Sequence, residues 1–152
     1  MKIAIGSDHR GFYAKQRLID LLQIRGHEVI DFGTDKNSSC DYPDSAYPTA
    51  ISVRDGQADK GILLCGSGIG MSIAANKVRG IRAALCHDEL TAEMSRRHND
   101  ANVLCMPADL VGEELIKRIV EIWIETEFEG GRHGRRVDKV MEFEAKMSDC
   151  EE

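Results

Sequence analysis

Residues 61–70, GILLCGSGIG, decide the fold of this chain. The stretch joins an apolar run that ends at Cys65 to a glycine-rich turn, and the small residues of 70–78 continue it at helix length. An apolar run without alternation is typical of a strand that is buried on both faces of a parallel sheet. We therefore predict a strand–turn–helix unit here, and the rest of the chain repeats that unit.

On both sides of this unit, short apolar runs alternate with helix-length amphipathic segments. Strands are predicted at residues 2–6, 28–32, 61–65, 81–86 and 102–106, helices at 12–25, 44–54, 70–78, 89–97, 112–125 and 137–147, and a loop at 34–42. Pro48 is expected to kink or delay the second helix. The pattern predicts a single α/β domain over residues 1–152, a Rossmann-like three-layer α/β/α sandwich with a five-stranded parallel sheet and an additional C-terminal helix. For that last helix, packing on the core is favoured over contact with a second subunit.

Composition and charge narrow the function classes. The 152 residues include 42% hydrophobic and 30% charged residues, a composition that is typical of a globular domain. Their formal net charge is −6. A net acidic protein is a poor candidate for binding nucleic acid or a membrane surface. No apolar run approaches the roughly 18–20 residues of a membrane span, and the N-terminal run is too short for a signal peptide. Five cysteines without a CxxC pair argue against a disulfide framework and a zinc site and favour a reducing cytoplasm. No His/Cys/Asp spacing resembles a metal site, so we predict no metal, and we expect no cofactor.

The turn at 66–70 is the first candidate site, because ligands bind beyond the carboxyl ends of the strands in parallel α/β sheets. Its alternating glycines expose backbone N–H groups at the start of a helix, which suits a phosphate or a developing oxyanion. A dinucleotide fingerprint is incomplete because Met71 stands where a glycine is needed, and no Walker A lysine follows. Cys65 lies at the positive end of the helix dipole, which favours the thiolate and predicts a reactive cysteine. The alternative is that Cys65 is a small core residue and that the glycines serve packing.

A second candidate site lies at 129–136, EGGRHGRR. Three arginines and a histidine within five residues of an acidic protein predict a phosphate clamp, which the glycines make flexible. The alternatives are a solvated basic turn that opens the last helix, and a nucleic-acid patch, which lacks interleaved aromatic residues. Elsewhere, His98 at a predicted helix end is a candidate acid–base residue, and His9 beside Asp8 lies after the first strand, at the edge where ligands bind.

Six ordered motifs resemble those of the ribose-5-phosphate isomerase type B family, which also includes galactose-6-phosphate and allose-6-phosphate isomerases. They are SDHRGF (7–12), DYP (41–43), CGSGIGMSIAANK (65–77), GIRAA (80–84), SRRHNDAN (95–102) and EGGRH (129–133), and the resemblance spans residues 1–147. It implies a metal-independent isomerase that interconverts ribose 5-phosphate and ribulose 5-phosphate through an enediolate, or acts on allose or galactose 6-phosphate. It also implies the strand order 2-1-3-5-4 and a homodimer with its active sites at the subunit interface.

The resemblance further implies a role for each site residue. Cys65 is the base that moves a proton between C1 and C2, and His98 is the acid that opens the furanose ring, with assistance from Asp8 and Tyr42. The enediolate oxygen is held by the backbone of Gly66, Ser67, Gly68, Ile69 and Gly70, with Ser67 also shuttling a proton between the two oxygens. The remaining ligands are Asn99 for the sugar hydroxyls and His9, Arg132 and Arg136 for the phosphate.

One position departs from the family pattern. The family commonly has an arginine near the phosphate in the loop after the fifth strand, where this chain has Asp109. An acid there is expected to weaken phosphate binding, so either Arg135 substitutes or the substrate is a different sugar phosphate. Whether Tyr42, His133 or Arg135 contacts the substrate stays open. Two other function classes also stay open, a sugar-phosphate-binding module without turnover and a redox sensor at Cys65.

Overall fold

The computed structural model describes residues 1–149, within which the chain forms five strands and six helices. In chain order they are β1 (Lys2–Ser7), α1 (Phe12–Ile24), β2 (Glu28–Asp31), α2 (Pro43–Arg54), β3 (Lys60–Cys65), α3 (Ile69–Ala75), β4 (Ala83–Leu85), α4 (Glu89–Asn99), β5 (Val103–Pro107), α5 (Glu113–Glu125) and α6 (Gly131–Asp149). Neighbouring strands are parallel, and their order across the sheet is β2-β1-β3-β5-β4. The predicted fold class and strand order are confirmed.

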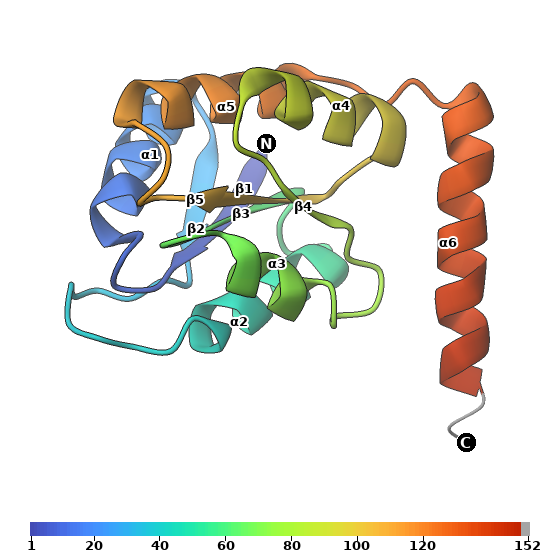
Figure 1. Cartoon of the computed structure of the whole chain (residues 1–152), viewed down its shortest axis with the longest axis horizontal. Helices are drawn as coiled ribbons and strands as arrows, with labels where there is room; N and C mark the ends of the chain where they lie inside the picture. Colours follow the sequence, from blue (N-terminus) through green and yellow to red (C-terminus); the bar gives the residue numbers. More distant parts are fainter. Residues whose placement is uncertain (150–152) are drawn as a thin grey trace.

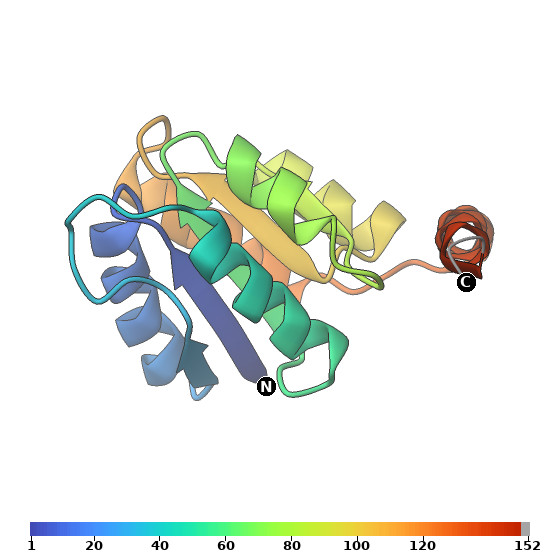
Figure 2. The same ribbon diagram turned by 90° about the horizontal axis from the view of Figure 1, so that it is seen from below.

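Helices cover both faces of the sheet, as Figures 1 and 2 show. The helices α1, α4 and α5 lie on one face, and α2 and α3 lie on the other. Successive residues of β3 point to opposite faces, so Ile62 and Leu64 belong to the first apolar cluster, and Leu63 and Cys65 belong to the second. From Gly61 to Cys65, β3 is buried on both sides, and this stretch has no charged residue.

Most element boundaries differ from the prediction by one to three residues, and the helix predicted at 70–78 ends at Ala75. The strand predicted at 81–86 is limited to β4, which starts only after Arg82. The helix α2 begins at Pro43, where a missing N–H costs no intrahelical hydrogen bond. It then continues through Pro48, so Pro48 does not delay it. Packing then holds α2 on the sheet, since Ala50 is fully buried. Tertiary contacts therefore outweigh the local preference of Pro48.

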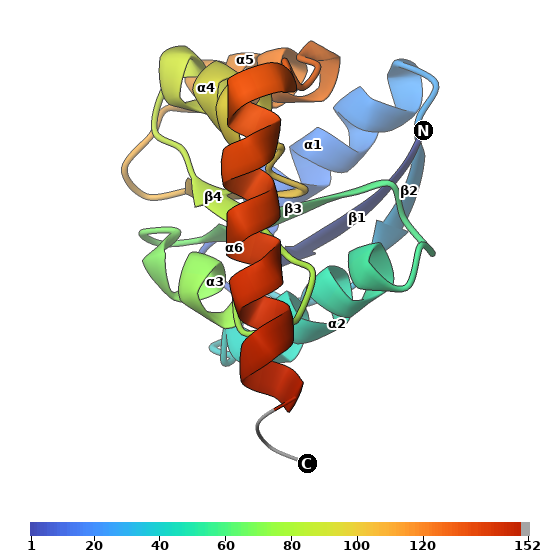
Figure 3. The same cartoon turned by 90° about the vertical axis from the view of Figure 1, so that its right-hand side faces the viewer.

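The helix α6 differs most from the prediction. It begins at Gly131, so the basic stretch forms its first two turns and is not a flexible approach to a helix at 137–147. The chain reverses at Gly130 and Gly131, where φ is 66° and 54°, and the N–H of His133 donates to the carbonyl of Gly130 (3.0 Å). Figure 1 shows α6 standing beside the α/β body, outside both layers, and in Figure 3, which views the molecule from that side, α6 lies in front of the sheet. The prediction that it packs on the core is wrong, because Val140 and Phe143 are 60% and 66% exposed.

No helix within residues 1–149 is long and apolar enough to cross a membrane. The four cysteines of this range, Cys40, Cys65, Cys86 and Cys105, are free thiols.

Gly68 is the position in the glycine turn where only glycine fits. Its φ is 73°, and a Cβ built there lies 2.5 Å from Leu85 Cδ1 and 2.9 Å from the carbonyl carbon of Met106. We expect Gly68→Ala to lower the free energy of unfolding by about 3 kcal/mol, through left-handed strain and overlap with backbone. Gly26→Ala is the matched control, because Gly26 has φ 81° with nothing within 4 Å of its Cβ, and a loss of about 1 kcal/mol is expected. Urea denaturation measures both, and equal losses would contradict the packing argument.

Candidate active site

Cys65 ends β3 at the carboxyl edge of the sheet and is 5% exposed. Its sulfur accepts a hydrogen bond from the N–H of Gly68 (3.1 Å), so the glycine turn wraps around the thiol. The carbonyl of Cys65 accepts from the N–H of Ala108 in the loop after β5 (2.8 Å). The turn and the neighbouring loop thus fix the position of the sulfur, and a backbone N–H dipole stabilises negative charge on it.

The glycine turn ends against the aromatic ring of Tyr42. The side chain of Ser67 accepts from the N–H of Ile69 (3.3 Å), which fixes its hydroxyl at the start of α3. A Cβ at Gly70 would lie 2.8 Å from Cζ of Tyr42, so the phenol of Tyr42 lies directly against the backbone of Gly70. Tyr42 precedes α2, which brings its hydroxyl to the same edge as Cys65.

Asp8 and His9 follow β1 at this edge and are both held by the backbone. Asp8 is 7% exposed, and its Oδ1 accepts from the N–H groups of Arg10 (2.9 Å) and Gly11 (3.2 Å). Nδ1 of His9 accepts from the N–H of Cys40 (3.3 Å), which ties the β1 loop to the loop after β2. We name this set the cysteine group: Asp8, His9, Tyr42, Cys65, Ser67 and the backbone of 66–70.

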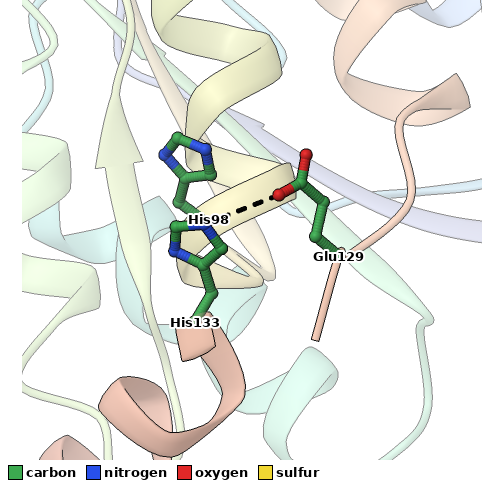
Figure 4. Close-up of side chains that lie close together, drawn as sticks. All are labelled: His98, Glu129 and His133. Carbon is green, nitrogen blue, oxygen red and sulfur yellow. Dashed lines mark ion pairs between the residues drawn. The ribbon is translucent and has the colours of Figure 1, made fainter. Parts of the chain in front are cut away.

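His98 lies elsewhere, in the last turn of α4, and stacks on His133 of α6. Their ring centroids are 4.0 Å apart and the planes differ by 9°. Figure 4 shows both rings with Glu129, whose Oε2 lies 3.5 Å from Nε2 of His133. Glu129 in turn accepts a hydrogen bond from Nε of Arg97 (2.6 Å), which lowers the pKa of this carboxyl. Sequence reasoning did not predict this cluster, because its parts come from three segments.

Asn99 and Arg136 line one cavity of about 420 Å³ between α4, β4 and α6. Val137 and Glu144 of α6 also line it. Arg132 belongs to the first turn of α6, next to His133, and its Nε lies 3.5 Å from Nε2 of that ring. We name this second set the histidine group: His98, Asn99, Arg132, His133 and Arg136.

The two groups lie at opposite ends of the strands, the cysteine group at the carboxyl ends and the histidine group near the amino ends. Cys65 pairs with Pro107 at the end of β5, whereas α4 and its His98 precede the start of β5 at Val103. Four residue steps along a strand span about 13 Å, and the N–H of Glu129 donates to the carbonyl of Arg97 at the far edge. Within one chain, therefore, the residues predicted to act together on one substrate are separated.

His98 and His133 of the histidine group form, together with Glu129, the one set of side chains within residues 1–149 that approaches a metal-ligand arrangement. Ligand atoms of His98, Glu129 and His133 lie within 4.8 Å of one another, and two histidines with a glutamate suit zinc. Lone pairs of imidazole lie in the ring plane, so two parallel rings stacked at 4.0 Å do not converge on one ion. Glu129 is moreover engaged with Arg97. The arrangement favours a stacked pair over a metal centre.

The surroundings of the His133 ring lead us to expect that folding stability depends on pH. Burial lowers the pKa of its ring below the ordinary 6.5, and the positive charges of His98, Arg132 and Arg136 lower it further, while Glu129 opposes them. The unfolded chain therefore binds this proton more tightly than the folded chain does. The contribution of the neutral ring to folding stability is complete above about pH 6.5 and is lost as the pH falls through the lower pKa of the folded state. We expect His133→Gln to flatten the decline in melting temperature between pH 7.5 and 5. A parallel decline in wild type and variant would exclude His133 as the cause.

The chain is similar to known proteins over nearly its whole length. The sequence model described as Ribose/Galactose Isomerase matches residues 3–140. The chain is 48% identical over 147 residues to ribose-5-phosphate isomerase B of Escherichia coli, covering 97% of this chain and 99% of that protein. The solved structure of Clostridium thermocellum ribose-5-phosphate isomerase B is 53% identical, with a TM-score of 0.95 and coverage of 97% and 99%. The Mycoplasma genitalium ribose-5-phosphate isomerase B, solved with bound ribulose 5-phosphate, is 40% identical, with a TM-score of 0.91 and coverage of 95% and 96%.

Proposed function

Because this chain belongs to the ribose/galactose isomerase family, we propose that it interconverts ribose 5-phosphate and ribulose 5-phosphate without a metal ion. The chain is a sugar-phosphate aldose–ketose isomerase, as its relatives are. The observation that carries the proposal is Cys65, whose sulfur lies at the carboxyl end of β3 and accepts the N–H of Gly68. The solved relative with bound ribulose 5-phosphate supports the choice of a pentose phosphate.

In the proposed reaction, the Cys65 thiolate removes the proton from C2 of the open-chain aldose. Electrons move into the carbonyl at C1, and the resulting enediolate oxygen is held by N–H groups of the glycine turn, where the negative charge develops. Ser67 passes a proton between the oxygens on C2 and C1. Cys65 then returns its proton to C1, which gives the ketose and restores the thiolate.

Before this step, the furanose ring must open. His98 protonates the ring oxygen as the C1–O bond breaks, and the C1 hydroxyl gives its proton to the carboxylate of Asp8 and becomes the aldehyde. Asp8 and Tyr42 assist at the cysteine group, Asn99 binds sugar hydroxyls, and the phosphate is held by His9, Arg132 and Arg136. Because Cys65 and His98 of one chain lie at opposite ends of the strands, a complete site takes the cysteine group from one subunit and the histidine group from the other.

The test is a coupled isomerase assay in the presence of EDTA. Ribose 5-phosphate, allose 6-phosphate and galactose 6-phosphate are compared at equal concentrations. We expect ribose 5-phosphate to give the highest kcat/KM, and EDTA to leave the rate unchanged. Turnover of a hexose phosphate alone would keep the reaction class and change the substrate. Sugar-phosphate binding without any turnover would overturn the proposal in favour of a binding module.

A further inference from the structure

Arg10 and Asp109 form an ion pair at the active edge to which no role has been assigned. Nε and Nη2 of Arg10 lie 2.6 and 2.5 Å from Oδ2 of Asp109. Arg10 follows β1 and Asp109 follows β5, and these strands flank β3 in the sheet. The pair therefore bridges the two loops on either side of the glycine turn.

The backbone at both ends of the pair is fixed. The N–H of Arg10 donates to Asp8 Oδ1 (2.9 Å), and the N–H of Asp109 donates to the carbonyl of Gly66 (3.1 Å). A Cβ at Gly66 would lie 2.7 Å from Oδ2 of Asp109 and 3.5 Å from Nε of Arg10. The ion pair thus lies against Gly66, one residue from Cys65.

Stability alone does not account for this arrangement. The side chains of Arg10 and Asp109 are 57% and 35% exposed, and exposed ion pairs contribute little to folding. The pair uses Nε and Nη2, so Nη1 and the outer part of the guanidinium face away from this carboxylate. A guanidinium with one side anchored on a carboxylate is preorganised to donate hydrogen bonds from the other to phosphate oxygens.

We propose that Arg10 is a phosphate ligand of this chain, and that Asp109 is the positioning residue that holds it over the glycine turn. The inference rests on the proposed function and adds a binding residue to the same site. It also gives a role to the acid whose place near a phosphate was unexpected. Asp109 does not face the phosphate as a bare charge, because Arg10 neutralises it.

The test compares Arg10→Gln with Arg17→Gln. Arg17 is a matched control, since it also lies in this region, is 52% exposed and pairs with an acid of the α5 segment, Glu113 (3.0 Å). We expect Arg10→Gln to raise KM for ribose 5-phosphate about tenfold with kcat within about threefold, because a charge-assisted hydrogen bond to the substrate is lost in ground and transition states alike. Equal KM values for the two variants would overturn the assignment, and a fall in kcat alone would mean that the pair only braces the turn.

Asp109→Asn tests the positioning role by whether the substitution raises or lowers KM for ribose 5-phosphate. If Asp109 holds Arg10, the substitution raises KM severalfold, although it removes a negative charge near the phosphate. In an Arg10→Gln background the same substitution lowers KM, because Asp109 is then an unpaired anion that repels the phosphate. A lower KM in both backgrounds would show that Asp109 acts by repulsion alone and would overturn its positioning role.

A measurement without turnover separates this inference from the proposed function. Inorganic phosphate is expected to raise the melting temperature of wild type and Arg17→Gln and to raise that of Arg10→Gln much less. If wild type isomerises no sugar phosphate but Arg10→Gln still loses the phosphate effect, the reaction is wrong and the ligand assignment holds. If wild type is active and all three proteins respond equally to phosphate, the ligand assignment is wrong.

Discussion

Replacing Cys65 by alanine is expected to lower kcat for ribose 5-phosphate by about 10³-fold, because a positioned base contributes roughly 10²–10⁴ to a proton transfer. The substitution removes the sulfur that accepts the N–H of Gly68 and leaves the backbone of the turn in place. Folding and substrate binding are therefore expected to persist. The coupled assay gives kcat, and the substrate-induced rise in melting temperature reports binding.

Cys86→Ala is the matched control for this prediction. Cys86 is 1% exposed in the apolar cluster on the other face of the sheet, and burial raises the pKa of its thiol, so it remains protonated. Its replacement is expected to lower stability slightly and to leave kcat within about twofold. An unchanged kcat in Cys65→Ala would remove Cys65 from the role of base. Equal losses in both variants would point to a packing effect.

The sequence predicted the architecture well because the three central strands, β1, β3 and β5, are buried on both faces. The run at 61–65 has no polar residue to interrupt it, and the glycine turn that follows marks the carboxyl edge. Both signals are local, so they can be interpreted without knowledge of the fold. The position of Cys65 against Gly68 follows from the same stretch, and the structure places the two groups in contact.

Contacts between distant segments were not predictable in the same way. The stack of His98 on His133 joins residues 35 positions apart, and the pair of Arg10 with Asp109 joins residues 99 positions apart. The two glycines at 130 and 131 were interpreted as flexible, whereas they reverse the chain and start α6 directly. Nothing in the apolar pattern of α6 indicates that the helix lies outside both layers and meets the body at α4 and at residues 80–82.

Two inactive variants are expected to restore activity when they share a dimer. Cys65→Ala lacks the base of the cysteine group, and His98→Gln lacks the acid of the histidine group. In a mixed dimer, one of the two sites combines the intact cysteine group of one subunit with the intact histidine group of the other. Random exchange gives half mixed dimers with one good site of two, so the mixture should reach about a quarter of wild-type activity. Each variant alone should stay near the background rate.

A mixture of Cys65→Ala with Cys65→Ser is the control, because every site in it lacks the cysteine and no activity should return. Sedimentation velocity on the same samples establishes the dimer itself. Two features support a shared site: Cys65 and His98 lie at opposite ends of the strands, and α6 stands beside the body (Figure 1) with Phe143 exposed. We propose that a second subunit covers this helix, which would bring the histidine group to a cysteine group other than its own. Full activity in a monomer would contradict the shared site, and so would a mixture that stays inactive although its dimers exchange subunits. Either result would show that Cys65 and His98 of the same chain act on one substrate.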